Sequence, residues 1–343
     1  MPDAADYIPA FKYGNKLYPQ HVVLPSMPLE GGKVWYVDGD QATGTHGGST
    51  WADAFSDAEF DGNLSALGVS AGDVVYVAGR TMAATDTDPI SYTTNLTINV
   101  PQVSIIGVSR GRTQGGLPQF KVGATTTQAI IRVRAPGVMI ANVGINGAGA
   151  TGGGISLDDD GGTTYAAFGW SVLGCHFKNC VGTTATNALT GGAVMIGSNG
   201  GAWQGLLAGN RFYKNVGDFV LMGTSGSVPQ DIVIEDNVFS GPAASVDVNV
   251  ITGGSGVNGL ILRNNEFPAM PALTSGTTKR YVDLTGSVGL MSGNRFASVT
   301  ATTSQVVTFA AAGSGGFVPL TVFMAQNYGE TVTDSESGEI TRK

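Results

Sequence analysis

Carboxylate side chains are the residues of this sequence best suited to chemistry, and three of them stand together at Asp158, Asp159 and Asp160. Two glycines follow them directly. Hard oxygen ligands beside a flexible turn could bind calcium or place carboxylates in a groove. Consecutive side chains diverge, however, so a solvated loop explains the cluster more simply. The three aspartates are candidates for a calcium site, but no assembled metal site is predicted.

A second acidic group consists of Glu235, Asp236 and Glu266, and arginines occupy nearby positions of the repeated segments. These arginines are Arg211, Arg263 and Arg295. Two carboxylates can cleave a glycosidic bond, so this face is a candidate site for acting on a polysaccharide. Pairing of opposite charges across neighbouring strands explains the pattern more simply and is the interpretation that we favour.

Other kinds of site find little support in the sequence. His21, His46 and His176 are scattered, so neither a metal cluster nor a nucleophilic triad is predicted. Trp170 and Trp203 are the best candidates for stacking against a sugar ring, although packing at the edge of a strand is the simpler role for each. We therefore predict no catalytic residue, no cofactor and no metal.

The composition indicates which elements must position these side chains. Glycine accounts for 52 of 343 residues, and charged residues make up 13% of the chain against about 25% in an average protein. Exposed helices need charged side chains on their wet face, so helical architectures are disfavoured. Short clusters of Val, Ile and Leu alternate with Gly, Asn, Ser and Thr, which is typical of β-strands and turns.

Charge and hydropathy exclude several classes of partner. The net charge is -8 and the basic residues are spread thinly, so nucleic acid is not an expected partner. The start of the chain lacks the pattern of a signal peptide, and no run approaches the ~18 apolar residues of a membrane span. Cys175 and Cys180 are expected to be two partly buried thiols and not a disulfide framework.

A repeat runs through the second half of the chain. Phe177, Phe212, Phe239, Phe267 and Phe296 are separated by 35, 27, 28 and 29 residues. A period of about 20–50 residues indicates a solenoid, a propeller or another repeated array. Two positions before these phenylalanines stand Cys175, Asn210, Asn237, Asn265 and Asn294. Each repeat has the pattern of a strand, a tight bend and a second strand.

The recurring asparagines predict how successive repeats contact one another. Asparagine tolerates the left-handed backbone conformation of a sharp corner, so these residues are expected at the bend. If coils stack at about 4.8 Å, the amides of Asn210, Asn237, Asn265 and Asn294 come within hydrogen-bonding distance of one another. The phenylalanines are expected to stack in a parallel column. Amides and rings together form the predicted structural ladder.

Four segments follow from these patterns. Residues 1–32, rich in proline, are expected to form an extended arm that lies along the body or binds a partner. Residues 33–72 form an N-terminal cap with one short amphipathic helix within 51–67, and residues 73–328 form the solenoid. Residues 329–343 form a polar tail.

These features resemble the right-handed parallel β-helix of the pectate-lyase type, with its asparagine ladder and inward aromatic stack. The resemblance implies an all-β fold in one solenoid. It also implies that an active member would cut polysaccharides, by calcium-assisted β-elimination or with two carboxylates. The sequence lacks the Asn-Thr-Asp and Arg-His-Gly motifs of the polygalacturonase-like pattern, which disfavours hydrolysis of that kind.

The segments 31–39 and 71–77 resemble those that begin the solenoids of bacteriophage virion proteins, namely head decoration proteins, head fibres and tailspikes. The expectation is therefore a non-enzymatic capsid decoration or cement protein on the surface of the phage particle. It would be a homotrimer, bound to the major capsid protein or another virion protein through its arm. The alternatives are a tailspike-like polysaccharide depolymerase and a non-catalytic adhesin that binds a glycan.

Overall fold

The computed structural model describes the chain in ten longer stretches and several isolated strands. The stretches are residues 31–41, 46–85, 88–108, 116–157, 167–181, 192–197, 202–221, 229–240, 256–268 and 287–296. Further strands are placed by their backbones at 11–13, 16–18, 250–251, 282–283, 307–308, 322–325, 327–329 and 340–341. The candidate calcium ligands Asp158, Asp159 and Asp160 lie outside the described residues.

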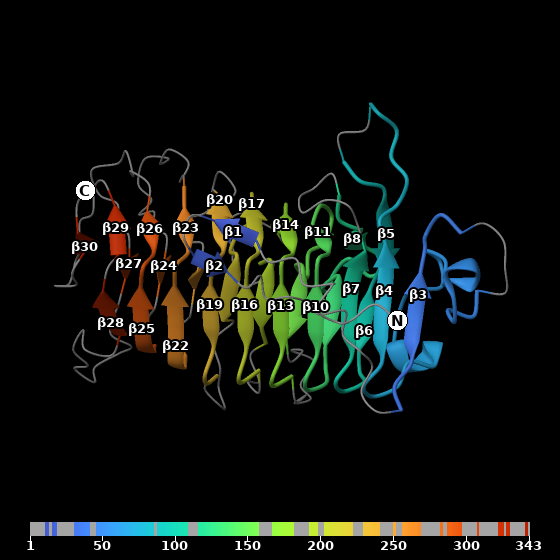
Figure 1. Ribbon diagram of the computed structural model, residues 1–343, viewed down its shortest axis with the longest axis horizontal. Coiled ribbons are helices and arrows are strands. Elements are labelled where there is room, and N and C mark those ends of the chain that lie inside the picture. The colour runs from blue at the N-terminus through green and yellow to red at the C-terminus, as the bar shows by residue number, and fades with distance from the viewer. Residues whose placement is uncertain are drawn as a thin grey trace.

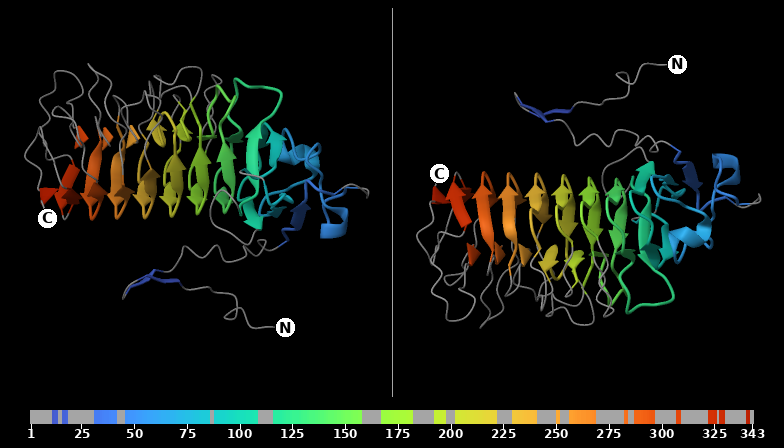
Figure 2. Two further views of the ribbon diagram at one scale, coloured as in Figure 1. Left: turned by 90° about the horizontal axis from the view of Figure 1, so that it is seen from above. Right: turned by 90° about the horizontal axis from the view of Figure 1, so that it is seen from below.

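The chain folds into a parallel β-helix, as the repeat predicts, and its strands stack along one axis into an elongated body (Figure 1). Three sheets run along the body, and from β4 to β27 each coil contributes one strand to each sheet in the order sheet 1, sheet 2, sheet 3. Neighbours within every sheet are the strands of successive coils and pair in parallel. The two further views show the same coils from above and below (Figure 2).

The strands of sheet 1 are β3 (Val34–Val37), β4 (Val74–Ala78), β7 (Ser104–Val108), β10 (Met139–Ala141), β13 (Ser171–Leu173), β16 (Leu206–Ala208), β19 (Val233–Glu235), β22 (Asn258–Arg263), β25 (Val288–Ser292) and β28 (Val322–Ala325). The strands of sheet 2 are β5 (Ser91–Thr94), β8 (Gln119–Val122), β11 (Gly144–Asn146), β14 (His176–Lys178), β17 (Arg211–Tyr213), β20 (Val238–Ser240), β23 (Glu266–Phe267), β26 (Arg295–Phe296), β29 (Asn327–Gly329) and β30 (Ile340–Thr341). The strands of sheet 3 are β6 (Leu96–Ile98), β9 (Ile131–Val133), β12 (Ile155–Leu157), β15 (Val194–Ile196), β18 (Phe219–Leu221), β21 (Val250–Ile251), β24 (Val282–Asp283) and β27 (Val307–Thr308). A separate hairpin, β1 (Phe11–Tyr13) and β2 (Lys16–Tyr18), precedes them.

In four successive sheet 2 strands, β14, β17, β20 and β23, one phenylalanine points into the solenoid, and the four rings form an aromatic column. Phe177, Phe212, Phe239 and Phe267 are fully buried, and successive rings stack with centroids 4.9 Å apart. The backbone of Phe296 continues the register, while its side chain lies outside the described residues. Because side chains alternate along a strand, the residues on either side of each phenylalanine face outward.

The corner between sheets 1 and 2 holds a column of buried amides. The Nδ2 of Asn210 donates to Oδ1 of Asn237 at 3.0 Å, Asn237 donates to Asn265 at 3.0 Å, and Asn265 donates to Asn294 at 2.9 Å. Each amide also donates to a carbonyl of the preceding coil. Every hydrogen-bonding group at this corner therefore has a partner away from water.

The sequence predicted that the ladder asparagine would adopt the left-handed conformation at this corner. This prediction is wrong, because the residue before each asparagine adopts it. Gly209, Asp236, Asn264 and Gly293 have positive φ, at 66°, 55°, 55° and 66°. Turning the chain one position earlier directs the next side chain inward, where its amide joins the column. The bend and the ladder are thus separate functions of two consecutive residues.

The N-terminal cap contains two short 3₁₀ helices and not the single helix expected within 51–67. These are η2 (Trp51–Asp53), capped by the Thr50 hydroxyl that accepts from the amide of Asp53 at 3.2 Å, and η3 (Leu64–Leu67). Between them, Phe55 forms a parallel bridge with Val37 and Gly62 has a φ of 73°. Both features break a helix, so the apolar residues Phe60 and Leu64 reach the core from a folded loop.

Candidate functional site

The outer face of sheet 2 carries several cationic side chains of the described coils. The inward phenylalanines of β14 and β17 are flanked by His176 and Lys178 on one strand and by Arg211 and Tyr213 on the next. The two strands pair in register, His176 with Arg211 and Lys178 with Tyr213, and they lie side by side in Figure 1. Adjacent strands are about 4.8 Å apart, so these four side chains form a compact group. We call them the sheet 2 quartet.

The four residues differ in their access to solvent. Arg211 is exposed and Tyr213 retains 42% of its surface, whereas His176 and Lys178 are buried. Lys214, which follows Tyr213 with a φ of 56°, places its Nζ 5.0 Å from the centre of the Tyr213 ring. Lys121, two strands before β14, is exposed on the same side of the sheet. An exposed cationic and aromatic surface therefore surrounds two buried basic residues.

His176 is neutral in the folded protein near pH 7. Burial, followed by the positive charges of Lys178 and Arg211, lowers the pKa of the imidazole to about 4, and Asp88 opposes this change only in part. A neutral imidazole carries a lone pair that can accept a proton. The quartet therefore holds a proton acceptor beside two cations and a phenol.

Lys178 is held by a carboxylate from a distant part of the chain. Its Nζ forms an ion pair with Asp88, which lies in the connection between β4 and β5 and retains half of its own exposure. Gln119 fixes the same connection, since its Nε2 donates to the carbonyl of Pro89 at 3.3 Å and to Ser91 Oγ at 2.7 Å. A segment that we call the Asp88 strap, residues 88–90, thus contacts the quartet from outside.

A carboxylate already binds where the quartet would receive an anion. Arginine and lysine recognise carboxylates through charge-assisted hydrogen bonds, and Arg211 is exposed beside Lys178 on the neighbouring strand. The arrangement is suited to binding an acidic group, removing a proton near it and returning one to a leaving oxygen. Those are the steps of β-elimination from an acidic sugar.

The carboxylates singled out from the sequence do not form one site. Glu235 is buried on sheet 1 and accepts from Arg263 Nε at 2.5 Å, whereas Glu266 is on sheet 2 and lies 3.5 Å from Arg295. Asp236 is the left-handed corner residue between the two sheets. Glu235 and Glu266 are thus engaged in cross-strand ion pairs on different faces, which is the simpler role that the sequence favoured.

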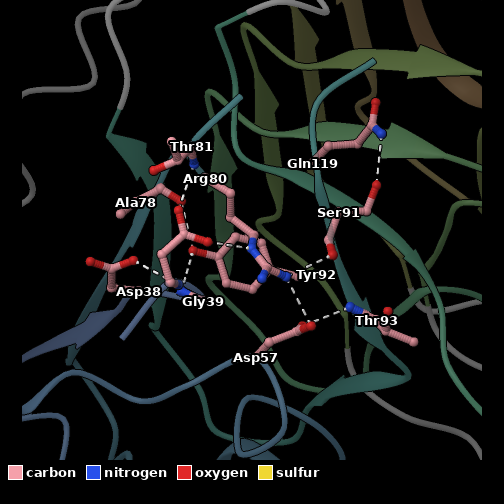
Figure 3. A network of polar contacts seen from close by, with 11 residues as sticks. Asp38, Gly39, Asp57, Ala78, Arg80, Thr81, Ser91, Tyr92, Thr93 and Gln119 are labelled. Atoms are coloured by element: carbon pink, nitrogen blue, oxygen red, sulfur yellow. Dashed lines mark hydrogen bonds and ion pairs between the residues drawn. The ribbon is translucent and has the colours of Figure 1, made fainter. Parts of the chain in front are cut away.

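A second polar group, at the cap, has a structural role (Figure 3). Arg80 bonds Asp40 and Asp57, each at 3.0 Å, and Asp57 also accepts from the amide of Thr93. Partial burial opposes ionisation of Asp40, but hydrogen bonds from Thr81 and the Arg80 charge hold its pKa below the usual value. The Tyr92 hydroxyl accepts from the amide of Gly39 and donates to the carbonyl of Ala78. These contacts fasten the cap to the first coil.

The remaining candidates separate by burial. Trp170 is 1% exposed and its Nε1 donates to the carbonyl of Ala202 at 3.1 Å, so the sugar-stacking role considered for it is wrong. Trp203 is 37% exposed. Cys175 and Cys180 are buried free thiols, and burial raises the pKa of both, to about 12 for Cys175.

In the part of the chain that the structure describes, no group of three or more His, Cys, Asp or Glu side chains is arranged to hold a metal ion. The same residues include no helix of the length and hydropathy required to cross a membrane.

The quartet is not among the sites expected from the sequence, although a signal is present. In those expectations His176 is only one of three scattered histidines, and Arg211 is only one of the arginines near the second acidic group. Once the phenylalanines are placed inward, the triplets 176–178 and 211–213 place a polar residue outward on each side of the ring. Neither triplet includes a carboxylate, and carboxylates are the residues from which candidate sites were expected.

No family model and no curated protein matches this sequence. Among solved structures, the chain resembles an alginate lyase from a Paenibacillus species, with 13% identity, a TM-score of 0.42, and coverage of 82% of this chain and 98% of that one. It also resembles a mannuronic acid specific polysaccharide family 6 lyase from human gut microbiota, with 12% identity, a TM-score of 0.27 and coverage of 77% of each chain.

This comparison corrects the function expected from the sequence. Both neighbours are polysaccharide lyases, so the expectation of a non-enzymatic capsid decoration protein is contradicted, as is the expectation that the chain is not an enzyme.

Proposed function

We propose that the protein is a polysaccharide depolymerase that cleaves an acidic polysaccharide by β-elimination on the outer face of sheet 2. The observation that carries the proposal is the sheet 2 quartet, in which a neutral His176 lies beside Lys178, Arg211 and Tyr213 on two paired strands. It lies on a cationic face of a protein whose net charge is -8. A concentration of positive charge in an acidic protein suits a polyanionic substrate.

The cations would bind the substrate through the carboxylate of a uronic acid unit. Arg211 offers a planar fork of donors to both oxygens, and Lys178 offers a second positive charge once Asp88 has been displaced. Their charge would stabilise the enolate-like transition state that develops when the proton next to the carboxylate is removed. This assigns Arg211 and Lys178 to charge neutralisation.

His176 and Tyr213 would move the protons. The imidazole takes the proton from the carbon beside the carboxylate, the bond to the glycosidic oxygen breaks as the new carbon–carbon double bond forms, and the Tyr213 phenol donates a proton to the leaving oxygen. A bound carboxylate would offset the field of Lys178 and Arg211 at His176. The imidazole would then become more basic when substrate is present.

The unsaturated product absorbs ultraviolet light, which provides the test. Alginate and polygalacturonate are incubated with the protein and with its Arg211→Ala, Tyr213→Phe and His176→Gln variants. We expect absorbance to rise with the wild type on at least one polymer and its rate to fall about 10²–10⁴-fold in each variant. Arg295→Ala, which removes an exposed cation of the same sheet, is the matched control and should retain activity. Absence of unsaturated product from every acidic polymer would overturn the proposal.

The proposed setting of this activity is the surface of a phage particle, where a tailspike-like depolymerase degrades host polysaccharide. The resemblance of segments 31–39 and 71–77 to those of virion proteins supports it. We also propose a homotrimer, since closed symmetry is the usual form of such assemblies. Labelling of the protein on intact particles tests the location, and the mass of the purified protein in solution tests the trimer.

A further inference from the structure

A ridge of exposed and half-buried residues lies at another corner of the solenoid, where the chain passes from sheet 3 to sheet 1. Its members directly precede the left-handed residue of that corner in successive coils. They are Pro101, Pro136, Phe168, Trp203 and Gln230. Backbone bonds link neighbours: Gly137 donates to the carbonyl of Phe168 at 2.9 Å, Gly169 to that of Trp203 at 2.8 Å, and Gln204 to that of Gln230 at 2.8 Å. We call this set the corner ridge.

The two aromatic members of the ridge lie outside the hydrophobic core. Phe168 is 39% exposed and Trp203 is 37% exposed, and they occupy equivalent positions of adjacent coils, three residues before the paired strands β13 and β16. Trp170, two residues after Phe168, is by contrast fully packed. Single exposed apolar residues are ordinary, but neighbouring exposed rings on one edge indicate a surface that contacts something else.

The groups around these rings are polar and mostly uncharged. The side chains of Gln204 and Gln230 are exposed beside Trp203, and each carries an amide that both donates and accepts hydrogen bonds. Asp231 is the charged residue next in line. Rings flanked by amides suit a ligand with alternating apolar faces and hydroxyl groups, which is the chemistry of a sugar.

The spacing of the coils also suits a linear polysaccharide. Successive ridge residues are separated by the distance between adjacent strands, about 4.8 Å. That distance is close to the length of one monosaccharide unit in an extended chain. A linear polysaccharide parallel to the solenoid axis could therefore place neighbouring sugar rings over Phe168 and Trp203.

We propose that the corner ridge is a non-catalytic binding site for a linear polysaccharide. The apolar faces of the sugar rings stack on Phe168 and Trp203, and the sugar hydroxyls bond the amides of Gln204 and Gln230. Binding here depends on ring faces and neutral hydrogen bonds, so it withstands high salt. Binding at the cationic sheet 2 face depends on charge and is weakened by salt. The proposal does not depend on catalysis at the quartet.

Affinity electrophoresis tests the site without any activity measurement. The full-length protein runs in native gels that contain alginate or the neutral polymer hydroxyethylcellulose, after equilibration in low salt or in about 1 M salt, where screening acts within ~3 Å. Retardation is compared for the wild type, the double variant Phe168→Ala with Trp203→Ala, and the control Trp51→Ala. Trp51 is 40% exposed on the cap, so the control removes a similarly exposed indole elsewhere.

We expect at least one polymer to retard the wild type at high salt, with a dissociation constant that rises at least about tenfold in the double variant and is unchanged in the control. Either of two results would overturn the proposal: no high-salt retardation of the wild type by either polymer, or equal retardation of the double variant. Circular dichroism establishes that the double variant is folded. Failure of β-elimination at the quartet would leave this result unaffected, so the two proposals are distinguishable.

Discussion

At the scale of single residues, the chemistry of this protein depends on where burial and charge meet. His176 and Lys178 are basic residues on an outer face, yet both are buried. The cost of burying Lys178 is offset by Asp88, and His176 avoids the cost by remaining neutral. The quartet is therefore a place where the fold accepts an electrostatic penalty, which is common at functional sites.

The low pKa of His176 makes stability depend on pH. Between about pH 6.5 and pH 4 the unfolded chain binds a proton at this residue and the folded chain does not, so stability falls as the pH falls through this range. The loss approaches about 3 kcal/mol by pH 4. Urea denaturation at a series of pH values should show this slope in the wild type and a smaller slope in His176→Gln. Equal slopes would contradict the altered pKa.

The amide column makes an equally specific prediction. Asn237→Ala leaves Asn210 Nδ2 without its acceptor and the carbonyl of Leu207 without its donor, and it opens a cavity in a fully buried place. We expect a loss of about 3 kcal/mol in urea denaturation. The control is Asn264→Gly at the adjacent left-handed position, where glycine fits without strain and the change should be under about 0.5 kcal/mol. Similar losses in both variants would contradict separate roles for bend and ladder.

At the scale of elements, the strands of sheet 2 and the connection between β4 and β5 each position part of the quartet. Sheet 2 supplies the register that places His176 beside Arg211, and the connection between β4 and β5 supplies Asp88, which pairs with Lys178. The Asp88 strap joins the first coil to a strand three coils away. It occupies with its own carboxylate the position that we assign to an acidic substrate.

Removing the strap's charge should therefore assist binding of an acidic polymer. In Asp88→Asn, Lys178 loses its anionic partner, and we expect the dissociation constant for the acidic polymer to fall several-fold at low salt because less charge must be displaced. Isothermal titration with short uronate oligosaccharides measures it. Asp61→Asn, which changes an exposed carboxylate of the cap away from both proposed binding sites, is the control. Weaker binding by Asp88→Asn would show that the strap helps to build the site.

Elements also show what the sequence could and could not predict. The strands of the coils and the amide column follow from the spacing of Phe212, Phe239 and Phe267, because inward residues repeat with every coil. Outward residues can differ from coil to coil, so the residues of the quartet do not recur at a fixed spacing and the sequence does not mark them. The contact of Asp88 with Lys178 spans 90 residues and leaves no local pattern. The single cap helix was predicted wrongly because two features interrupt it. Phe55 bridges to Val37 of the neighbouring strand, and Gly62 adopts a left-handed backbone conformation, so tertiary structure overrides the local helix propensity.

At the scale of the whole molecule, the solenoid presents different chemistry on different sides. The sheet 2 face is cationic, and the corner ridge is aromatic and neutral. The sheet 2 face and the corner ridge both extend parallel to the solenoid axis, so an extended polymer could lie along either of them. The two ends of the solenoid must be covered, because each coil is stabilised by its neighbours and a terminal coil has only one neighbour.

The Arg80 network is the fastening of the N-terminal end. Arg80→Gln removes ion pairs to Asp40 and Asp57, both partly exposed, so we expect a modest cost of about 1 kcal/mol. Hydrogen exchange should rise in β4 and β5 while β16 and β17 are unchanged. Arg295→Gln, in a more exposed pair, is the control and should leave exchange unaltered in the coils near the cap. Uniform acceleration along the whole solenoid would contradict a local fastening.

The masses of the oligosaccharides released from an acidic polysaccharide test the central claim most directly. Elimination breaks the glycosidic bond without adding water, so each new non-reducing end carries a double bond and lacks the mass of one water relative to a hydrolysis product. We predict products of the lower mass from the wild type and their loss in Arg211→Ala. Products of the higher mass, or unsaturated products that persist in Arg211→Ala, would contradict elimination at the sheet 2 quartet.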